Sequence, residues 1–64
     1  MKYEEFYMKA RECAKKAQVR ATIDHVNGRH IARFSDGTTV IGNNPSKKVT
    51  VRWGDGHTAQ AQWG

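Results

Sequence analysis

Five cations recur from residue 20 onward among threonines and glutamines. They are Arg20, Arg29, Arg33, Lys48 and Arg52. Guanidinium groups and hydroxyls both donate hydrogen bonds to phosphate oxygens. The net charge of +5 would also attract a polyanion through a long-range field that salt screens. These residues therefore predict contact with a DNA or RNA backbone, and Lys15 and Lys16 would extend the same surface.

The same charges are compatible with other functions. Electrostatic complementarity steers a basic surface to an acidic protein as well as to nucleic acid. The alternative function is therefore a protein-interaction module, such as a small inhibitor or modulator of the mobile-element type that docks on a larger nucleic-acid-handling machine. Two further alternatives are a solvated sheet face without a ligand and a structural subunit that pairs with its own copies.

The histidines raise the question of a metal site. His25 and His30 would face each other across a hairpin and could approach one ion. A third strong ligand does not follow, because Asp24 would point to the opposite face and Cys13 would belong to a helix. We expect histidines that either have their hydrogen bonds satisfied within the fold or lie at its rim, and we expect neither a metal nor a cofactor.

Catalytic residues are not expected either. Nucleophilic chemistry needs a nucleophile, a base and an orienting group that meet in a cleft, and a chain of 64 residues offers little concavity. Asp36 and Asp55 stand in glycine-containing turns, where aspartate is favoured for backbone reasons. The sequence thus predicts a binding protein and not an enzyme.

A helix is expected over residues 3–17, where apolar residues at helical spacing form one stripe. The stripe consists of Tyr3, Phe6, Tyr7, Ala10, Cys13, Ala14 and Ala17. Acids in the first turn and Lys15 and Lys16 in the last turn suit the helix dipole. We expect the stripe to be buried, with Cys13 as a small core residue.

After Gln18 the apolar period changes from about 3.6 residues to about 2, which is typical of strands. The expected strands cover residues 19–26, 29–34, 38–42, 47–53 and 57–63, with no internal repeat. Asn27-Gly28 predicts a two-residue type I′ turn, and Asp36-Gly37 predicts the next. Residues 43–46 make a looser connection, and Gly54-Asp55-Gly56 turns the chain into the last strand.

The loop lengths predict which side chains share a face. A two-residue loop at Asn27-Gly28 places His25 opposite His30 and Ile23 opposite Ala32. The outer face then carries Arg20, Thr22, Asp24, Arg29, Ile31 and Arg33. In the last hairpin Lys48, Thr50, Arg52, Thr58, Gln60 and Gln62 are expected outside.

The opposite face of the sheet is apolar and would receive the helix stripe. Its expected core residues, besides Phe6 and Ala10, are Ile23, Phe34, Val49 and Val51. The alternation of side chains along the strand also places Trp53 on the inner face. Trp63 is expected to close the bottom of the core.

The resulting fold class is α+β. It consists of an N-terminal amphipathic helix packed on a four- to five-stranded antiparallel meander, in a single domain over residues 1–64. The order of elements and the tripeptide Val26-Asn27-Gly28 resemble the Sm-like RNA-binding proteins, and other small SH3-like barrels share the strand count. The resemblance implies a small barrel and carries over no site residue.

Composition sets the remaining expectations. With 38% hydrophobic and 27% charged residues, the chain is too apolar for a disordered tail and too polar for a membrane span. One cysteine cannot form an internal disulfide, and acids near the N-terminus interrupt any signal-peptide pattern. We therefore expect a cytoplasmic protein without a membrane partner, and oligomerisation would compensate for its small core.

Overall fold

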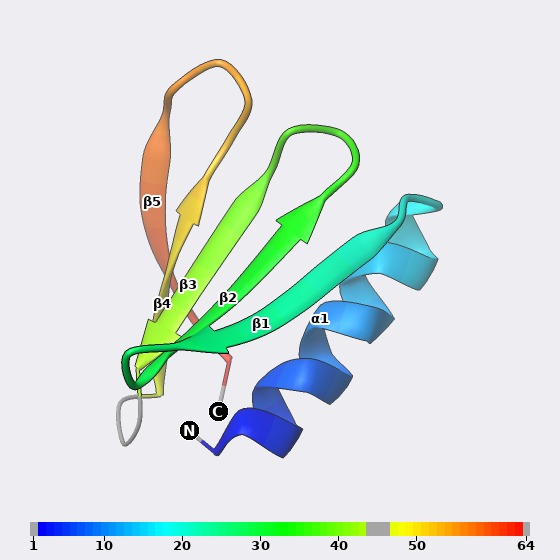
Figure 1. The fold of residues 1–64 in the computed structure, drawn as a ribbon. Coiled ribbons are helices and arrows are strands. Elements are labelled where there is room, and N and C mark those ends of the chain that lie inside the picture. Colours follow the sequence, from blue (N-terminus) through cyan, green and yellow to red (C-terminus); the bar gives the residue numbers. More distant parts are fainter. Residues whose placement is uncertain (1, 44–46, 64) are drawn as a thin grey trace.

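The computed structural model describes residues 2–43 and 47–63, in which one helix precedes five strands (Figure 1). The elements are α1 (Tyr3–Ala17), β1 (Ala21–Val26), β2 (Arg29–Phe34), β3 (Thr39–Asn43), β4 (Lys48–Arg52) and β5 (Thr58–Gln62). Each strand pairs antiparallel with the next, so that β1 and β5 form the edges of an open sheet. The predicted α+β fold is confirmed, and the five strands of the described residues form one open antiparallel sheet.

The predicted element bounds are close to those observed. The helix has the predicted bounds, whereas every strand except β2 differs from its predicted range by one or two residues at one or both ends. The chain leaves the helix through Gln18, whose φ of 57° is left-handed, and the Val19 N–H donates to the Ala14 carbonyl over 3.0 Å. Residues 44–46 of the predicted connection, and residues 1 and 64 of the predicted domain, lie outside the described residues.

The predicted registers of the first and last hairpins are those observed. His25 lies opposite His30 and Ile23 opposite Ala32, while Val49 lies opposite Ala61. Since side chains alternate between the two faces of a strand, these registers also confirm the predicted faces of the paired residues. Arg20, a residue expected on the outer face, precedes β1 and is not among them.

The β2–β3 and β4–β5 hairpins are structural repeats, and the prediction of no internal repeat is wrong. Equivalent residues differ by 19 positions. The pairs are Arg33 and Arg52, Phe34 and Trp53, Asp36 and Asp55, Gly37 and Gly56, and Thr39 and Thr58. The Asp36 carboxylate accepts the Thr38 N–H over 2.9 Å, and the Asp55 carboxylate accepts the His57 N–H over 3.0 Å. The glycines have φ values of 95° and 97°, which explains why glycine follows each aspartate.

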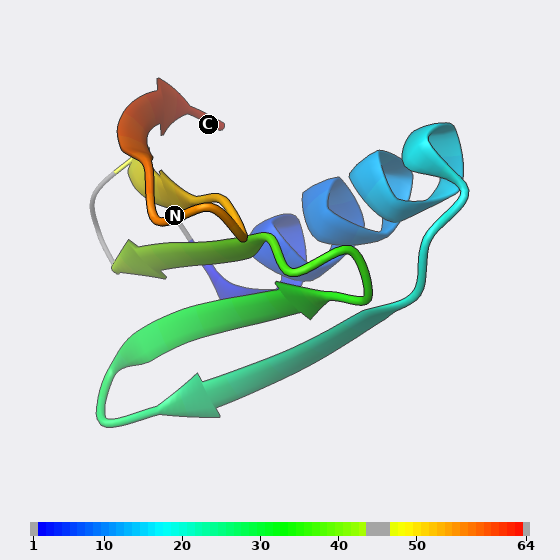
Figure 2. The same cartoon turned by 90° about the horizontal axis from the view of Figure 1, so that it is seen from above.

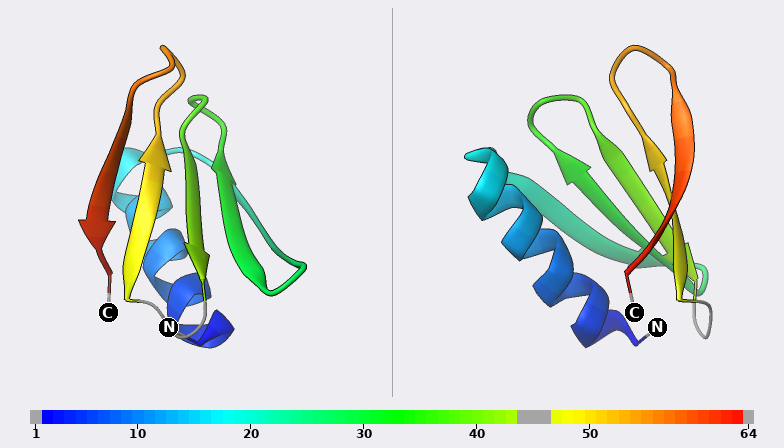
Figure 3. Two further views of the ribbon diagram at one scale, coloured as in Figure 1. Left: turned by 90° about the vertical axis from the view of Figure 1, so that its left-hand side faces the viewer. Right: turned by 180° about the vertical axis from the view of Figure 1, so that it is seen from behind.

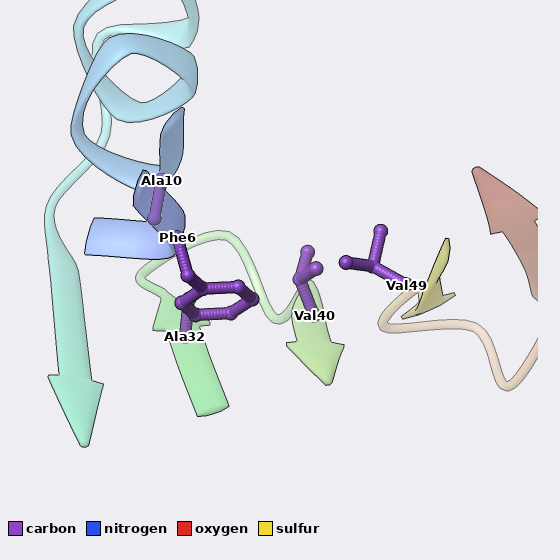
Figure 4. Close-up of a cluster of buried hydrophobic side chains, with 5 residues drawn as sticks. All are labelled: Phe6, Ala10, Ala32, Val40 and Val49. Carbon is purple, nitrogen blue, oxygen red and sulfur yellow. The ribbon is translucent and has the colours of Figure 1, made fainter. Parts of the chain in front are cut away.

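The core lies between the first half of α1 and the middle of the sheet (Figure 4). Its buried hydrophobic residues are Phe6, Ala10, Ala32, Val40 and Val49, and Ile23, Phe34, Val51, Ala61 and Trp63 pack against them while partly exposed. The predicted core is thus confirmed, although three of its members, Ile23, Phe34 and Val51, are only partly buried. The Trp63 ring lies 5.3 Å from the Phe6 ring, as expected for a residue that closes the core.

The helix covers only part of the inner face. It packs mainly against β1 and β2, and the β4–β5 turn stands far from it (Figures 1 and 3). Seen from above, the curled sheet carries β5 away from the C-terminal half of α1 (Figure 2). A helix about 10–12 Å wide cannot span five strands spaced about 4.8 Å apart.

Two predictions fail because of this incomplete cover. Trp53 comes directly after β4, at a position that alternation assigns to the inner face, but it is 44% exposed. Cys13 is exposed on the helix and is not a core residue. Of the helix stripe, Phe6, Ala10 and Ala14 are buried, whereas Tyr7 and Ala17 are exposed like Cys13, so the predicted burial of the stripe is wrong for these three residues.

Candidate nucleic-acid interface

The register aligns outer-face side chains in rows that cross the sheet. One row runs through all five strands as Thr22, Arg33, Thr39, Arg52 and Thr58. Neighbouring strands lie about 4.8 Å apart, so the backbones at Arg33 and Arg52, two strands apart, are separated by about 10 Å. The structural repeat therefore presents the same arginine and threonine arrangement twice.

A second row lies four residues away along the strands. In it Arg29 lies opposite Asn43, and Lys48 lies opposite Gln62. At about 3.4 Å per residue, the two rows are separated by about 13 Å. The cations Arg29, Arg33, Lys48 and Arg52 thus mark the corners of a patch of about 10 by 13 Å. We call these four exposed residues the basic sheet face.

The space between the two rows is mostly uncharged. Ile31 lies opposite Ile41 at its centre, and both are partly buried. Asp24 lies on the same face and approaches Arg33 over 3.8 Å, with both side chains more than half exposed. Such an exposed pair is weak, so Asp24 lowers the local positive charge without immobilising Arg33.

The other three predicted site residues lie apart from the basic sheet face. Arg20 precedes β1, where its N–H donates to the Ser35 hydroxyl over 3.1 Å and its carbonyl accepts the Ser35 N–H over 2.9 Å. Lys15 and Arg20 line a groove between the end of α1 and the start of β1 that Lys16 does not line. Consecutive helix residues are about 100° apart, which separates Lys15 from Lys16.

That groove, the helix–edge groove, has a volume of about 750 Å³. Its lining residues are Arg11, Glu12, Ala14, Lys15, Val19, Arg20 and Ala21. The Arg11 guanidinium lies 5.6 Å from the centre of the Tyr7 ring and donates to the Tyr7 hydroxyl over 3.1 Å. The groove thus combines three cations and one carboxylate with an apolar floor, which strand alternation alone could not indicate.

Aromatic side chains are absent from the described part of the outer face. Phe34 lies on the core side of the sheet, and Trp63 packs on Phe6. Trp53 comes after β4 at a position that alternation assigns to the inner face. Proteins that hold single strands by stacking place aromatic rings among their basic residues. The basic sheet face consequently offers contacts to a backbone and no stacking platform.

The histidines form part of an aromatic cluster beside the core. The rings of His25 and His30 lie 4.9 Å apart, and the Tyr3 ring lies 5.6 Å from each. His30 is 1% exposed and also packs on Phe6. Residues 2–43 and 47–63 contain no group of three or more His, Cys, Asp and Glu side chains arranged to hold a metal ion.

The β2–β3 and β4–β5 turns each carry an aspartate whose pKa is lowered. The backbone N–H of Thr38 lowers the pKa of Asp36, and the backbone N–H of His57 lowers that of Asp55. The His57 ring nitrogen Nδ1 also lies 2.7 Å from the Asp55 carboxylate. These bonds stabilise the turns, which lie at one end of the sheet where Gly37 and Gly54 approach each other.

The described residues include no helix long and apolar enough to cross a bilayer. No protein-family model matches the chain, and no match is found among the curated proteins or the solved structures.

Proposed function

We propose that the protein binds nucleic acid through the basic sheet face, holding the phosphate backbone with little sequence preference. The observation that carries this proposal is the pair of cation rows that the two hairpins set across one exposed face. Arginine and lysine neutralise phosphates and release counterions, while threonine hydroxyls donate further hydrogen bonds. Neither kind of contact reads base identity.

The test is the salt dependence of binding. We would titrate the protein against two fluorescein-labelled DNA duplexes of unrelated sequence and follow the anisotropy between about 50 and 200 mM salt. Four phosphate contacts predict a slope of log K against log salt of about −3 to −4. The two duplexes should bind with similar affinity, because the contacts position the backbone without reading bases.

A matched pair of charge reversals separates the face from the net charge. Arg33→Glu should weaken binding to both duplexes and flatten the slope by about one unit. Lys2→Glu changes the net charge equally but lies at the N-terminal end of α1, outside the strands that carry the basic sheet face, and should have only a small effect. Undetectable binding at low salt, or equal effects of the two variants, would refute the proposal.

A further inference from the structure

β5 forms one edge of the sheet and is paired on one side only (Figures 1 and 3). At its C-terminal end the Trp63 N–H donates to the Lys47 carbonyl over 3.0 Å. Backbone bonding alternates along an antiparallel strand. Thr58, Gln60 and Gln62 therefore direct their N–H and C=O groups away from β4, and all three residues are exposed.

The two edges of the sheet differ in how open they are. On β1 the Tyr3 hydroxyl donates to the Ile23 carbonyl over 3.4 Å, and the Tyr3 ring packs on His25. Among the described residues, no hydrogen bond reaches the outward groups of β5. β5 also lacks the lysine, proline or bulge that commonly protects an exposed edge. A further strand can therefore pair with β5 through main-chain hydrogen bonds.

The sequence of β5 is self-complementary for antiparallel pairing. Polar residues alternate with alanine on both sides of Gln60, as Thr58-Ala59-Gln60-Ala61-Gln62. A two-fold axis at Gln60 places this residue opposite its own copy, and Thr58 opposite Gln62 of the second copy. Each outward residue then exchanges both backbone hydrogen bonds with the residue opposite. Ala59 lies opposite Ala61 of the second copy, where small side chains cause no clash.

The charge distribution also favours a second copy at this edge. β5 carries no charged side chain, and the nearest outer-face cations, Lys48 and Arg52, lie on β4. In the two-fold register, Arg52 is three strand spacings from Lys48 of the second copy, about 14 Å. That distance exceeds the Debye length of about 8 Å at physiological salt. Two chains of charge +5 can thus pair here without close like charges, whereas an acidic partner would gain no ion pair on β5.

The inner face adds an apolar contribution at the same edge. Ala59 lies on the inner face but is exposed, and Trp53 beside it is 44% exposed. In the two-fold register the row of Val51 and Ala59 continues into Ala61 of the second copy, so the exposed alanine gains an apolar neighbour. We propose that two copies of the chain pair through β5 about a two-fold axis at Gln60, which joins their sheets into one.

Such a dimer is closed and lengthens the outer-face rows. An isologous contact uses the same edge of both copies, so assembly stops at two chains. Thr58 ends the row that contains Arg52, and Gln62 of the second copy ends the row that contains its Lys48. Pairing of Thr58 with Gln62 joins these cations in one row across the junction. The use of this longer row for phosphate contacts rests on the proposed function, whereas pairing through β5 requires no nucleic acid.

The test measures self-association without nucleic acid. Between about 10 μM and 1 mM protein, sedimentation equilibrium should show the mass rising from 7.2 kDa toward twice that value. Over the same range, hydrogen exchange of the ¹⁵N-labelled chain should slow at the amides of Thr58, Gln60 and Gln62, because the dimer bonds these N–H groups. Ala59 and Ala61 already donate to β4 and should change little.

Substitutions at Gln60 test the two-fold register. Gln60→Lys and Gln60→Glu each place like charges opposite one another and should weaken self-association at least about tenfold. An equimolar mixture of the two variants should associate again as a mixed dimer. Thr50→Lys is the matched control for Gln60→Lys, because Thr50 lies opposite Gln60 on β4 and is exposed but does not reach the junction. It should have little effect.

Gln60→Pro tests the backbone pairing. Proline lacks the N–H, and this N–H points away from β4, so the β4–β5 ladder is retained while dimer formation should be lost. Gln60→Thr keeps the N–H and should still dimerise. Circular dichroism would establish that all variants are folded.

Several outcomes would overturn the inference. They are a mass that stays at 7.2 kDa over the whole range, association without slowed exchange at the three outward amides of β5, equal effects of Thr50→Lys and Gln60→Lys, and slowed exchange that requires added duplex DNA or another protein. A chain that dimerises but binds no DNA would refute the proposed function alone, so the two failures are distinguishable.

Discussion

Gly42 leaves the inner face of β3 bare, and the Phe6 ring occupies the space. A Cβ atom at this position would lie 3.2 Å from Phe6 Cδ2 and 3.1 Å from Val49 Cγ1, closer than such atoms ordinarily pack. The helix can approach the sheet this closely only because the residue is glycine. The core depends on this contact, since Phe6 is its largest buried side chain.

Gly42→Ala should therefore destabilise the protein by about 1–3 kcal/mol through overpacking. Urea unfolding would measure the change. Phe6→Leu should relieve the clash, so that the double variant loses less free energy of unfolding than the sum of the two single variants. Strict additivity would show that the methyl group is accommodated elsewhere.

Asp36 and Asp55 make the stability of the turns depend on pH. Hydrogen bonds from Thr38 and His57 hold the folded pKa of each carboxyl below its ordinary value of 3.8. A lowered folded pKa adds stability above the ordinary value, and this stability is lost as the pH falls through the folded pKa. The thermal midpoint should decrease as the pH is lowered below about 3.8, and less so in the double variant Asp36→Asn with Asp55→Asn. An identical pH profile for the variant and the parent chain would contradict this assignment.

At the scale of elements, a single helix stabilises a five-stranded sheet by burying one side chain deeply. Phe6 is fully buried, whereas Met8, two residues along the helix, is 63% exposed. The remaining buried positions of α1 are the alanines Ala10 and Ala14, which bring the helix backbone close to the sheet. Most of the attachment of α1 therefore depends on one aromatic ring.

Phe6→Ala should cost about 3 kcal/mol or more, because a large group is removed from a small core. A lower urea midpoint with an unchanged far-UV spectrum at zero denaturant is the expected result. Met8→Ala serves as the control on the same helix and should change the stability by less than about 0.5 kcal/mol. An unchanged midpoint for Phe6→Ala would show that the helix is not held there.

At the scale of the whole molecule, the β2–β3 and β4–β5 hairpins present the same pairing of an arginine with a threonine twice. Arg33 faces Thr39 on the first hairpin, and Arg52 faces Thr58 on the second. Pairing of β3 with β4 joins the two hairpins into one continuous row. The basic sheet face is thus a property of the assembled sheet and of neither hairpin alone.

This repetition predicts equal contributions of Arg33 and Arg52 to nucleic-acid binding. Arg33→Gln and Arg52→Gln should each flatten the salt slope by about one unit, and the double variant by about two. Lys9→Gln on the helix should leave the slope nearly unchanged. A large effect at only one of the two arginines would show that the two hairpins do not bind equivalently.

Local chemistry was sufficient to predict much of this fold from the sequence. The helical stripe and the charges at its ends predicted α1 over residues 3–17, and Asn27-Gly28 predicted the β1–β2 register with His25 opposite His30. A short turn determines its own pairing, and strand alternation then assigns each side chain to a face. The outer placement of Arg29, Arg33, Lys48 and Arg52 followed from these rules alone.

Only the tertiary structure decided what covers each face and which separate rows meet. The β3–β4 connection carries no turn signal that sets a register, so the alignment of Arg33 with Arg52 emerges only in the assembled sheet. Cys13 lies on the predicted helix stripe and Trp53 follows the predicted strand alternation. Both are nevertheless exposed, because one helix is too narrow to cover five strands. The helix–edge groove likewise depends on how α1 packs beside β1, which the period of neither element determines.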